Sequence, residues 1–142
     1  KESELYFNNK FDFIIDLDVT SPLRKIDDIK NAYIKFRKYN SNNLISVYEA
    51  GKNPYFNQIE FKKNKYDLVK KIKANPIRRQ DSPKVYNMNA SIYIWKRDFL
   101  LKSKTIFNNK TSIYIMPKSR SIDIDNKFDL QILKYLMKKK KL

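Results

Sequence analysis

Apolar residues in the first third of the chain alternate between short runs and a helical repeat. Residues 11–17 form a run typical of strands that are buried on both faces, and residues 44–48 form a second short run. Between the two runs, apolar residues recur at the spacing of a helix: Ile26, Ile29, Tyr33 and Phe36. Asp27 and Asp28 favour the positive end of such a helix. The order strand, helix, strand predicts a right-handed βαβ unit.

The second half of the chain continues this alternation. We predict strands over residues 91–95 and 111–116, with a short helix over residues 97–101 between them. A final helix is expected after residue 125, with four apolar residues on one face: Phe128, Ile132, Tyr135 and Leu136. Alternating strands and helices predict an α/β fold built on a sheet.

The segment of residues 51–79 breaks the alternation. Asn53 and Pro54 mark a turn, residues 58–61 form a short strand, and residues 62–65 can close a hairpin. The segment is polar and has no helical stripe strong enough to pack on a sheet. We therefore expect a solvated excursion, or an arm that reaches a partner subunit.

Composition excludes several kinds of site. The 142 residues contain no cysteine and no histidine, which excludes disulfides, Cys/His zinc sites and histidine-dependent catalytic triads. A bound metal must then be a hard cation held by oxygen ligands, for which Mg²⁺ is the best candidate. Gly51 is the single glycine, so the chain contains neither a Walker loop nor a GxGxxG loop for phosphates.

The charge of the chain raises an alternative function. A net charge of +16 is typical of nucleic-acid-binding modules. The lysines are spread through the chain, however, and the one run, residues 138–141, is typical of a solvated tail. Scattered positive charge also suits small anions such as triphosphates and sugar acids. With no apolar run of bilayer length and no signal peptide at residues 1–4, we expect a soluble, cytoplasmic protein.

Four motifs follow one another along the chain. They are residues 17–24 (LDVTSPLR), 78–83 (RRQDSP), 86–94 (YNMNASIYI), and 121–125 (SIDID) followed by Asp129. In sequence, order and spacing they resemble the acylneuraminate cytidylyltransferases, which make CMP-activated sialic, legionaminic and related acids. The resemblance implies a single domain with a three-layer, mostly parallel sheet of the nucleotidyltransferase type, GT-A or Rossmann-like. It also implies a homodimer whose protruding dimerisation arm and active-site loop is the segment of residues 51–79.

Two acidic residues near the end of the chain are the candidate metal ligands. In an extended segment, residues two apart share a face, so Asp123 and Asp125 would point together into a cleft while Ile122 and Ile124 face the core. Mg²⁺ that bridges the two carboxylates to substrate phosphates would relieve their repulsion. The alternative is a loop in which Asp125 caps the last helix. The resemblance implies that the pair holds the catalytic magnesium.

The resemblance assigns further residues to the acidic sugar. Arg79 would grip a carboxylate or phosphate with two hydrogen bonds, beside Gln80, and Asn89 would hydrogen-bond the sugar. Taken alone, paired arginines are more often solvated, and Asn89 suits a turn or the entry to a strand. The family's usual Asn-Gly-Ala is Asn89-Ala90-Ser91 in this chain. A positive φ at Ala90 would therefore be strained.

The loop after the first strand holds the remaining candidates. Asp18 lies at the carboxyl end of that strand, where open α/β sheets bind ligands. Many family members have glutamine followed by proline there. Asp18 would accept hydrogen bonds from a sugar yet repel its carboxylate, or it would cap the loop. Ser21 and Arg24 are further candidates for substrate contact, with shaping of the turn as the alternative.

For the complete enzyme, the resemblance implies attack by the anomeric hydroxyl of a nine-carbon acidic sugar on the α-phosphorus of CTP, with release of pyrophosphate. Asp123, Asp125 and Arg79 would be the catalytic residues. Nothing in the sequence matches the glycine- and basic-rich loop with which the family begins and which holds the CTP phosphates. We therefore expect the 142 residues alone to be inactive. An inactive family member that serves as a subunit, or a basic nucleic-acid-binding module, is the alternative.

Overall fold

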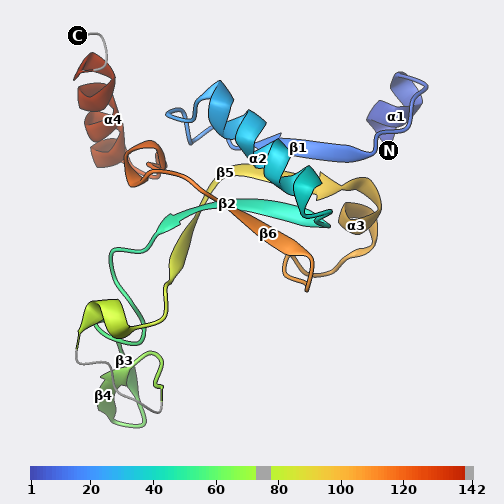
Figure 1. Cartoon of the computed structure of the whole chain (residues 1–142). Coiled ribbons are helices and arrows are strands. Elements are labelled where there is room, and N and C mark those ends of the chain that lie inside the picture. The colour runs from blue at the N-terminus through green and yellow to red at the C-terminus, as the bar shows by residue number, and fades with distance from the viewer. Residues whose placement is uncertain (73–77, 140–142) are drawn as a thin grey trace. The chain divides into compact units, whose positions relative to one another are not determined.

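The computed structural model describes residues 1–72 and 78–139. The chain forms two compact units (Figure 1). The sheet unit comprises Lys1–Tyr48 and Met88–Leu142, and the hairpin unit comprises Glu49–Asn87.

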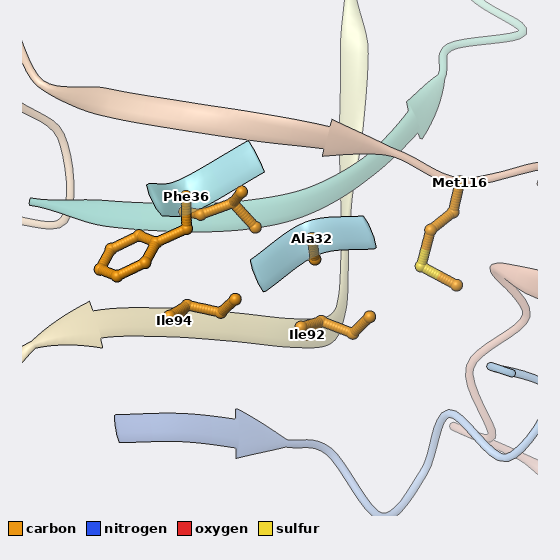
Figure 2. Packing of buried hydrophobic residues seen from close by; sticks show 6 residues of the cluster. Ala32, Phe36, Ile92, Ile94 and Met116 are labelled. Atoms are coloured by element: carbon orange, nitrogen blue, oxygen red, sulfur yellow. The ribbon is translucent and has the colours of Figure 1, made fainter. Parts of the chain in front are cut away.

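The sheet unit is built on four strands: β1 (Phe13–Leu17), β2 (Asn43–Glu49), β5 (Tyr86–Lys96) and β6 (Thr111–Ile115). Their order in the sheet is β1-β5-β2-β6. β1 pairs antiparallel with β5, whereas β2 pairs parallel with β6. In Figure 2, β5 runs against the other three strands. The α/β fold is thus confirmed with a mixed sheet of four strands, and the three-layer, mostly parallel arrangement stays a prediction.

Helix α2 (Ile26–Lys38) packs on this sheet and forms the main core. Ala32 and Phe36 on its inner face lie with Ile92 and Ile94 of β5 (Figure 2). The remaining buried members of the cluster are Leu44 and Met116. The helical repeat predicted from sequence thus supplies the apolar face that covers the sheet.

Three shorter or peripheral helices complete this unit: α1 (Glu2–Tyr6), α3 (Arg97–Lys102) and α4 (Lys127–Lys139). In α1, Glu4 forms an ion pair with Arg97, whose hydrogen bonds and charge lower the pKa of Glu4 to about 2. Within residues 1–72 and 78–139, no helix is both long enough and apolar enough to cross a membrane.

One sequence-based expectation about burial is wrong, and a second holds only in part. The strand predicted over residues 11–17 is the shorter β1, and none of its residues is fully buried, because β1 lies at the edge of the described sheet. In α4 the buried residue is Leu133, whereas Phe128 and Tyr135 are 67% and 58% exposed. Ile132 and Leu136 are half-buried on the side of Leu133, so the inward face of α4 agrees with the predicted one in part.

The hairpin unit confirms the predicted hairpin. Strands β3 (Ile59–Lys62) and β4 (Lys65–Leu68) pair antiparallel, and the two residues between them, Lys63 and Asn64, have φ angles of 53° and 59°. Positive φ at both positions is the geometry of a tight two-residue hairpin turn. The predicted turn at Asn53 is also present, since its side-chain oxygen accepts the Tyr55 amide at 2.9 Å. That this unit is a dimerisation arm stays a prediction.

Candidate functional site

The loop that follows β1 is closed by its own side chains. Asp18 Oδ1 accepts the Thr20 amide at 2.8 Å and the Thr20 hydroxyl at 2.7 Å. These hydrogen bonds, the one from the amide first, lower the pKa of Asp18. Asp18 therefore caps the loop, which was one of its two predicted roles, and its contact with a sugar stays a prediction.

Ser21 and Arg24 tie this loop to β5. The Ser21 hydroxyl is fully buried and donates to the Asn89 carbonyl at 3.2 Å. The Arg24 guanidinium donates to the carbonyls of Asp18 at 2.6 Å and Ser91 at 3.0 Å. Both side chains thus shape the loop, which was the alternative role, and their contact with substrate stays a prediction.

Asn89 is the central residue of a buried polar cluster. Its side-chain oxygen accepts the Ser46 hydroxyl at 2.6 Å and the Ser91 amide at 3.3 Å. Its side-chain nitrogen donates to Ser121 Oγ at 2.9 Å and to Met116 Sδ at 3.3 Å. An amide offers two acceptor and two donor positions, and all four are used within the protein. With Asn89 only 4% exposed, the structure places it as a joint between strands and loops, and its hydrogen bond to the sugar stays a prediction.

The backbone next to Asn89 is strained, as its sequence indicates. Ala90 has a φ of 52°, in the left-handed region. A side chain with a Cβ is disfavoured there by about 1–2 kcal/mol relative to its ordinary conformation. The strain lies between two buried residues, Asn89 and Ser91, whose hydrogen bonds hold the backbone in place.

We expect Ala90→Gly to raise the free energy of unfolding by about 0.5–1 kcal/mol. Glycine removes the steric clash of the Cβ at positive φ, but it also raises the conformational entropy of the unfolded chain, which offsets part of the stabilisation. Urea unfolding followed by the fluorescence of Trp95 measures it. Ala32→Gly is the control: Ala32 lies in α2 and is fully buried, so its replacement should lower stability by about 1 kcal/mol or more. A loss of stability in Ala90→Gly would contradict the assigned strain.

The segment of residues 121–125 carries the two acidic candidates on a backbone that is held at several points. The Ser121 hydroxyl donates to the Pro117 carbonyl at 3.0 Å, and the Ile124 amide donates to the Thr20 carbonyl at 3.1 Å. Asp123 Oδ1 accepts the Ile124 amide at 3.1 Å. This segment, which we call the acidic segment, is thereby joined to the loop that holds Asp18 and Thr20.

Asp125 does not cap the last helix. Asn126 Oδ1 accepts the amides of Phe128 at 2.9 Å and Asp129 at 3.1 Å, and is the cap of α4. Asp129 in turn accepts the amides of Asp125 and Asn126, each at 3.1 Å. The Asp125 side chain is exposed, and in residues 1–72 and 78–139 no donor bonds its carboxylate. The capping alternative is therefore wrong.

The oxygen ligands that the acidic segment offers suit a hard metal cation only in part. Among the described residues there is no group of three or more acidic side chains placed to hold a metal ion. Two carboxylates on a restrained backbone do fit Mg²⁺, which binds through one or two carboxylates and takes its other ligands from water and substrate phosphates. The role of Asp123 and Asp125 as metal ligands stays a prediction.

A buried ion pair, which the sequence reasoning missed, stands directly before the acidic segment. Arg120, the last residue of the 3₁₀ helix η2 (Lys118–Arg120), donates to Asp28 through Nε at 3.0 Å and Nη2 at 2.6 Å. Asp28 is 1% exposed and also accepts the Lys25 amide at 2.8 Å and the Tyr114 hydroxyl at 3.3 Å. Burial by itself would raise the pKa of Asp28, but the hydrogen bonds and charge of Arg120 outweigh it and lower that pKa. Its place in the helical repeat, four residues before Ala32, could have revealed Asp28 as buried.

The hairpin unit brings Arg79 and Gln80 together at one cavity. The cavity measures about 280 Å³ and is lined by Glu49, Ala50, Asn53, Arg79, Gln80, Ser82, Pro83, Lys84 and Val85. Arg79 Nη2 donates to the Ala50 carbonyl at 3.0 Å, and this bond uses one of the five N–H donors of a guanidinium. Lys84 adds a second cation that the sequence reasoning missed. Because Arg79 and the acidic segment belong to different units, the predicted joint role of Arg79, Asp123 and Asp125 in catalysis stays a prediction.

No model of a protein family matches the chain. Curated relatives match nearly all of it. A Campylobacter coli protein named post-translational flagellin modification protein B is 45% identical over 140 residues, which are 99% of this chain and 59% of that protein. The CMP-N,N'-diacetyllegionaminic acid synthase of Campylobacter jejuni is 44% identical over the same shares of the two chains. An N-acylneuraminate cytidylyltransferase of Streptococcus agalactiae is 33% identical over 124 residues, 87% of this chain and 29% of that protein.

The α/β fold and these relatives define the class: the chain is a homologue of enzymes that are named as cytidylyltransferases. More narrowly, its homologues include proteins named CMP-N,N'-diacetyllegionaminic acid synthase and N-acylneuraminate cytidylyltransferase, which agrees with the family that its four motifs resemble. It spans about three fifths of the first two relatives, 59% of each.

Proposed function

We propose that this chain serves in the transfer of CMP from CTP to the anomeric hydroxyl of a nine-carbon acidic sugar, with release of pyrophosphate. The observation that carries the proposal is 44% identity over 99% of the chain to a protein named CMP-N,N'-diacetyllegionaminic acid synthase. The same relative makes a sugar of the legionaminic type the first candidate.

Residues of each unit would have a distinct role in this reaction. Asp123 and Asp125 would hold Mg²⁺, which when bound supplies positive charge to the phosphate oxygens. Arg79 would bind the sugar carboxylate through its guanidinium fork, with Gln80 beside it at the same cavity. Asn89 would act from inside, by holding the Asp18 loop and the acidic segment to the sheet.

The test is whether the protein encoded by the longest open reading frame that contains this chain synthesises CMP-sugar. CTP and Mg²⁺ are supplied with N,N'-diacetyllegionaminic acid or N-acetylneuraminic acid, and the product is identified by mass spectrometry. We expect product with the first sugar. The 142-residue chain is assayed in parallel and should form none, since it has one glycine and no glycine-rich phosphate loop. Absence of CMP-sugar with either acid from the longer protein would overturn the proposal.

We further propose that two copies of the protein associate through the hairpin unit. Ile59, Phe61 and Tyr66 are 66%, 64% and 74% exposed on this hairpin. Phe61 and Tyr66 are cross-strand partners with ring centroids 5.0 Å apart, so they form one apolar patch. Aromatic residues of this kind are enriched at protein–protein interfaces.

Replacing Phe61 and Tyr66 by serine should therefore weaken self-association by at least about 30-fold, the effect of losing one strong interface contact. Sedimentation equilibrium of the 142-residue chain measures the dimer dissociation constant. Phe128→Ser is the matched control, because Phe128 is 67% exposed on α4 in the other unit. A monomeric wild-type chain, or equal weakening by the control, would contradict the proposed contact.

A further inference from the structure

The Asp28–Arg120 pair is built for orientation. Asp28 receives four hydrogen bonds, which is the capacity of a carboxylate, and Arg120 supplies two of them as a fork. A buried ion pair seldom stabilises a fold more than apolar residues of equal volume would, because both ions lose their hydration. What a bidentate pair adds is a fixed geometry between two backbone segments.

The two segments that this pair joins are a rigid helix and the start of the acidic segment. Asp28 lies in the first turn of α2, one turn before Ala32 and two turns before Phe36, which anchor that helix on the sheet. Arg120 directly precedes residues 121–125. Further along, the Ile124 amide is bonded to the Thr20 carbonyl and Asp129 accepts the Asp125 amide. The carboxylates of Asp123 and Asp125 thus stand on a backbone held before, between and after them.

We propose that Asp28 and Arg120 are positioning residues which fix the acidic segment so that Asp123 and Asp125 present a preformed site for a divalent cation. The cation arm of this inference rests on the function proposed above for the two carboxylates. The positioning arm does not, because it concerns the backbone of the acidic segment with no metal present.

Two variants distinguish the bidentate geometry of the ion pair from its charge. Arg120→Lys keeps the positive charge but loses the fork, and Asp28→Asn keeps the size but loses the charge. Arg97→Lys is the matched control, since Arg97 also forms an ion pair, with Glu4, and its side chain is 22% exposed, as is that of Arg120. Amide NMR spectra of each variant of the 142-residue chain report whether the fold is retained.

The first measurement is hydrogen exchange of the Ile124 amide without metal. We expect Arg120→Lys and Asp28→Asn to speed this exchange by about tenfold or more, relative to wild type and to Arg97→Lys, because local opening of the segment becomes easier. Exchange that is unchanged in both variants, or equally faster in the control, would overturn the proposal. Should Asp28→Asn fail to fold, Arg120→Lys decides alone.

The second measurement is the affinity for Mn²⁺, used in place of Mg²⁺ and followed by paramagnetic broadening of amides 123–126. Loss of a residue that orients metal ligands lowers metal affinity by about 10–100-fold, and we expect a drop in this range for Arg120→Lys with none for Arg97→Lys. Faster exchange with unchanged affinity would overturn the role toward the cation. If wild type binds no Mn²⁺, the metal role of Asp123 and Asp125 fails, and hydrogen exchange still decides whether the pair holds the segment.

Discussion

Replacement of Asn89 by alanine is expected to lower the free energy of unfolding by about 3–5 kcal/mol. The Ser46 hydroxyl and the Ser91 amide lose their acceptor, and both residues are fully buried. Each buried polar group left without a partner costs about 1–3 kcal/mol, and the space of the missing amide adds to the loss. Urea unfolding of the 142-residue chain, followed by circular dichroism, measures the change.

The size of this change separates the two roles considered for Asn89. A residue that contacts substrate and nothing else could be replaced with a loss below about 1 kcal/mol, and such a result would contradict the joint described above. Asn109→Ala is the control, since Asn109 is exposed in a turn and its replacement should change stability by less than about 0.5 kcal/mol. Ser46→Ala removes one member of the cluster and should give an intermediate loss of about 1–2 kcal/mol.

Replacement of Asp125 by asparagine is expected to lower the rate of CMP-sugar synthesis about a thousandfold while leaving the fold intact. The side chain is exposed and receives no hydrogen bond from the residues that the structure describes, so its charge contributes little to stability. If it holds a cation at the phosphates, its loss removes several kcal/mol of charge stabilisation, and about 4 kcal/mol corresponds to a thousandfold in rate. Steady-state turnover of the longer protein over a range of Mg²⁺ concentrations measures both rate and metal requirement.

Asp27→Asn is the matched control for this variant. Asp27 is an exposed acidic residue in the first turn of α2 and belongs to none of the candidate sites. Turnover by Asp27→Asn should stay within about twofold of wild type, as a surface charge change has little effect on chemistry elsewhere. Turnover by Asp125→Asn within tenfold of wild type would remove Asp125 from the machinery.

Much of the local structure could be predicted from the pattern of residues. The repeat of Ile29, Tyr33 and Phe36 became α2, and the turn between Lys62 and Lys65 closed the hairpin. Both depend on neighbours in sequence: helical spacing places apolar side chains on one face, and a two-residue turn needs only its own dihedral angles. The strain at Ala90 was foreseen from the resemblance, because the family's usual glycine stands where this chain has a residue with a Cβ.

The roles of the polar candidates could not be predicted in this way. Asn89, Ser21 and Arg24 were candidates for substrate contact, yet each is bonded to protein groups about 30–70 residues away in sequence. A polar side chain takes whichever partner the fold brings within about 3 Å, and a local pattern carries no record of that partner. Asp28 shows the converse, because a residue read as a helix-end charge is a buried anchor for Arg120.

By itself, the sequence determined the order of the elements, the helical and hairpin periodicities, the exclusion of histidine and cysteine chemistry, and the family resemblance. Only the tertiary structure decided that Asn126 and not Asp125 caps α4, that Asn89 joins two loops to the sheet, and that Arg79 and Gln80 share a cavity. The physical reason is the distance along the chain over which each effect acts. Backbone periodicity and residue chemistry act within a few positions along the chain, whereas burial and hydrogen-bond partners are set by segments that meet only after folding.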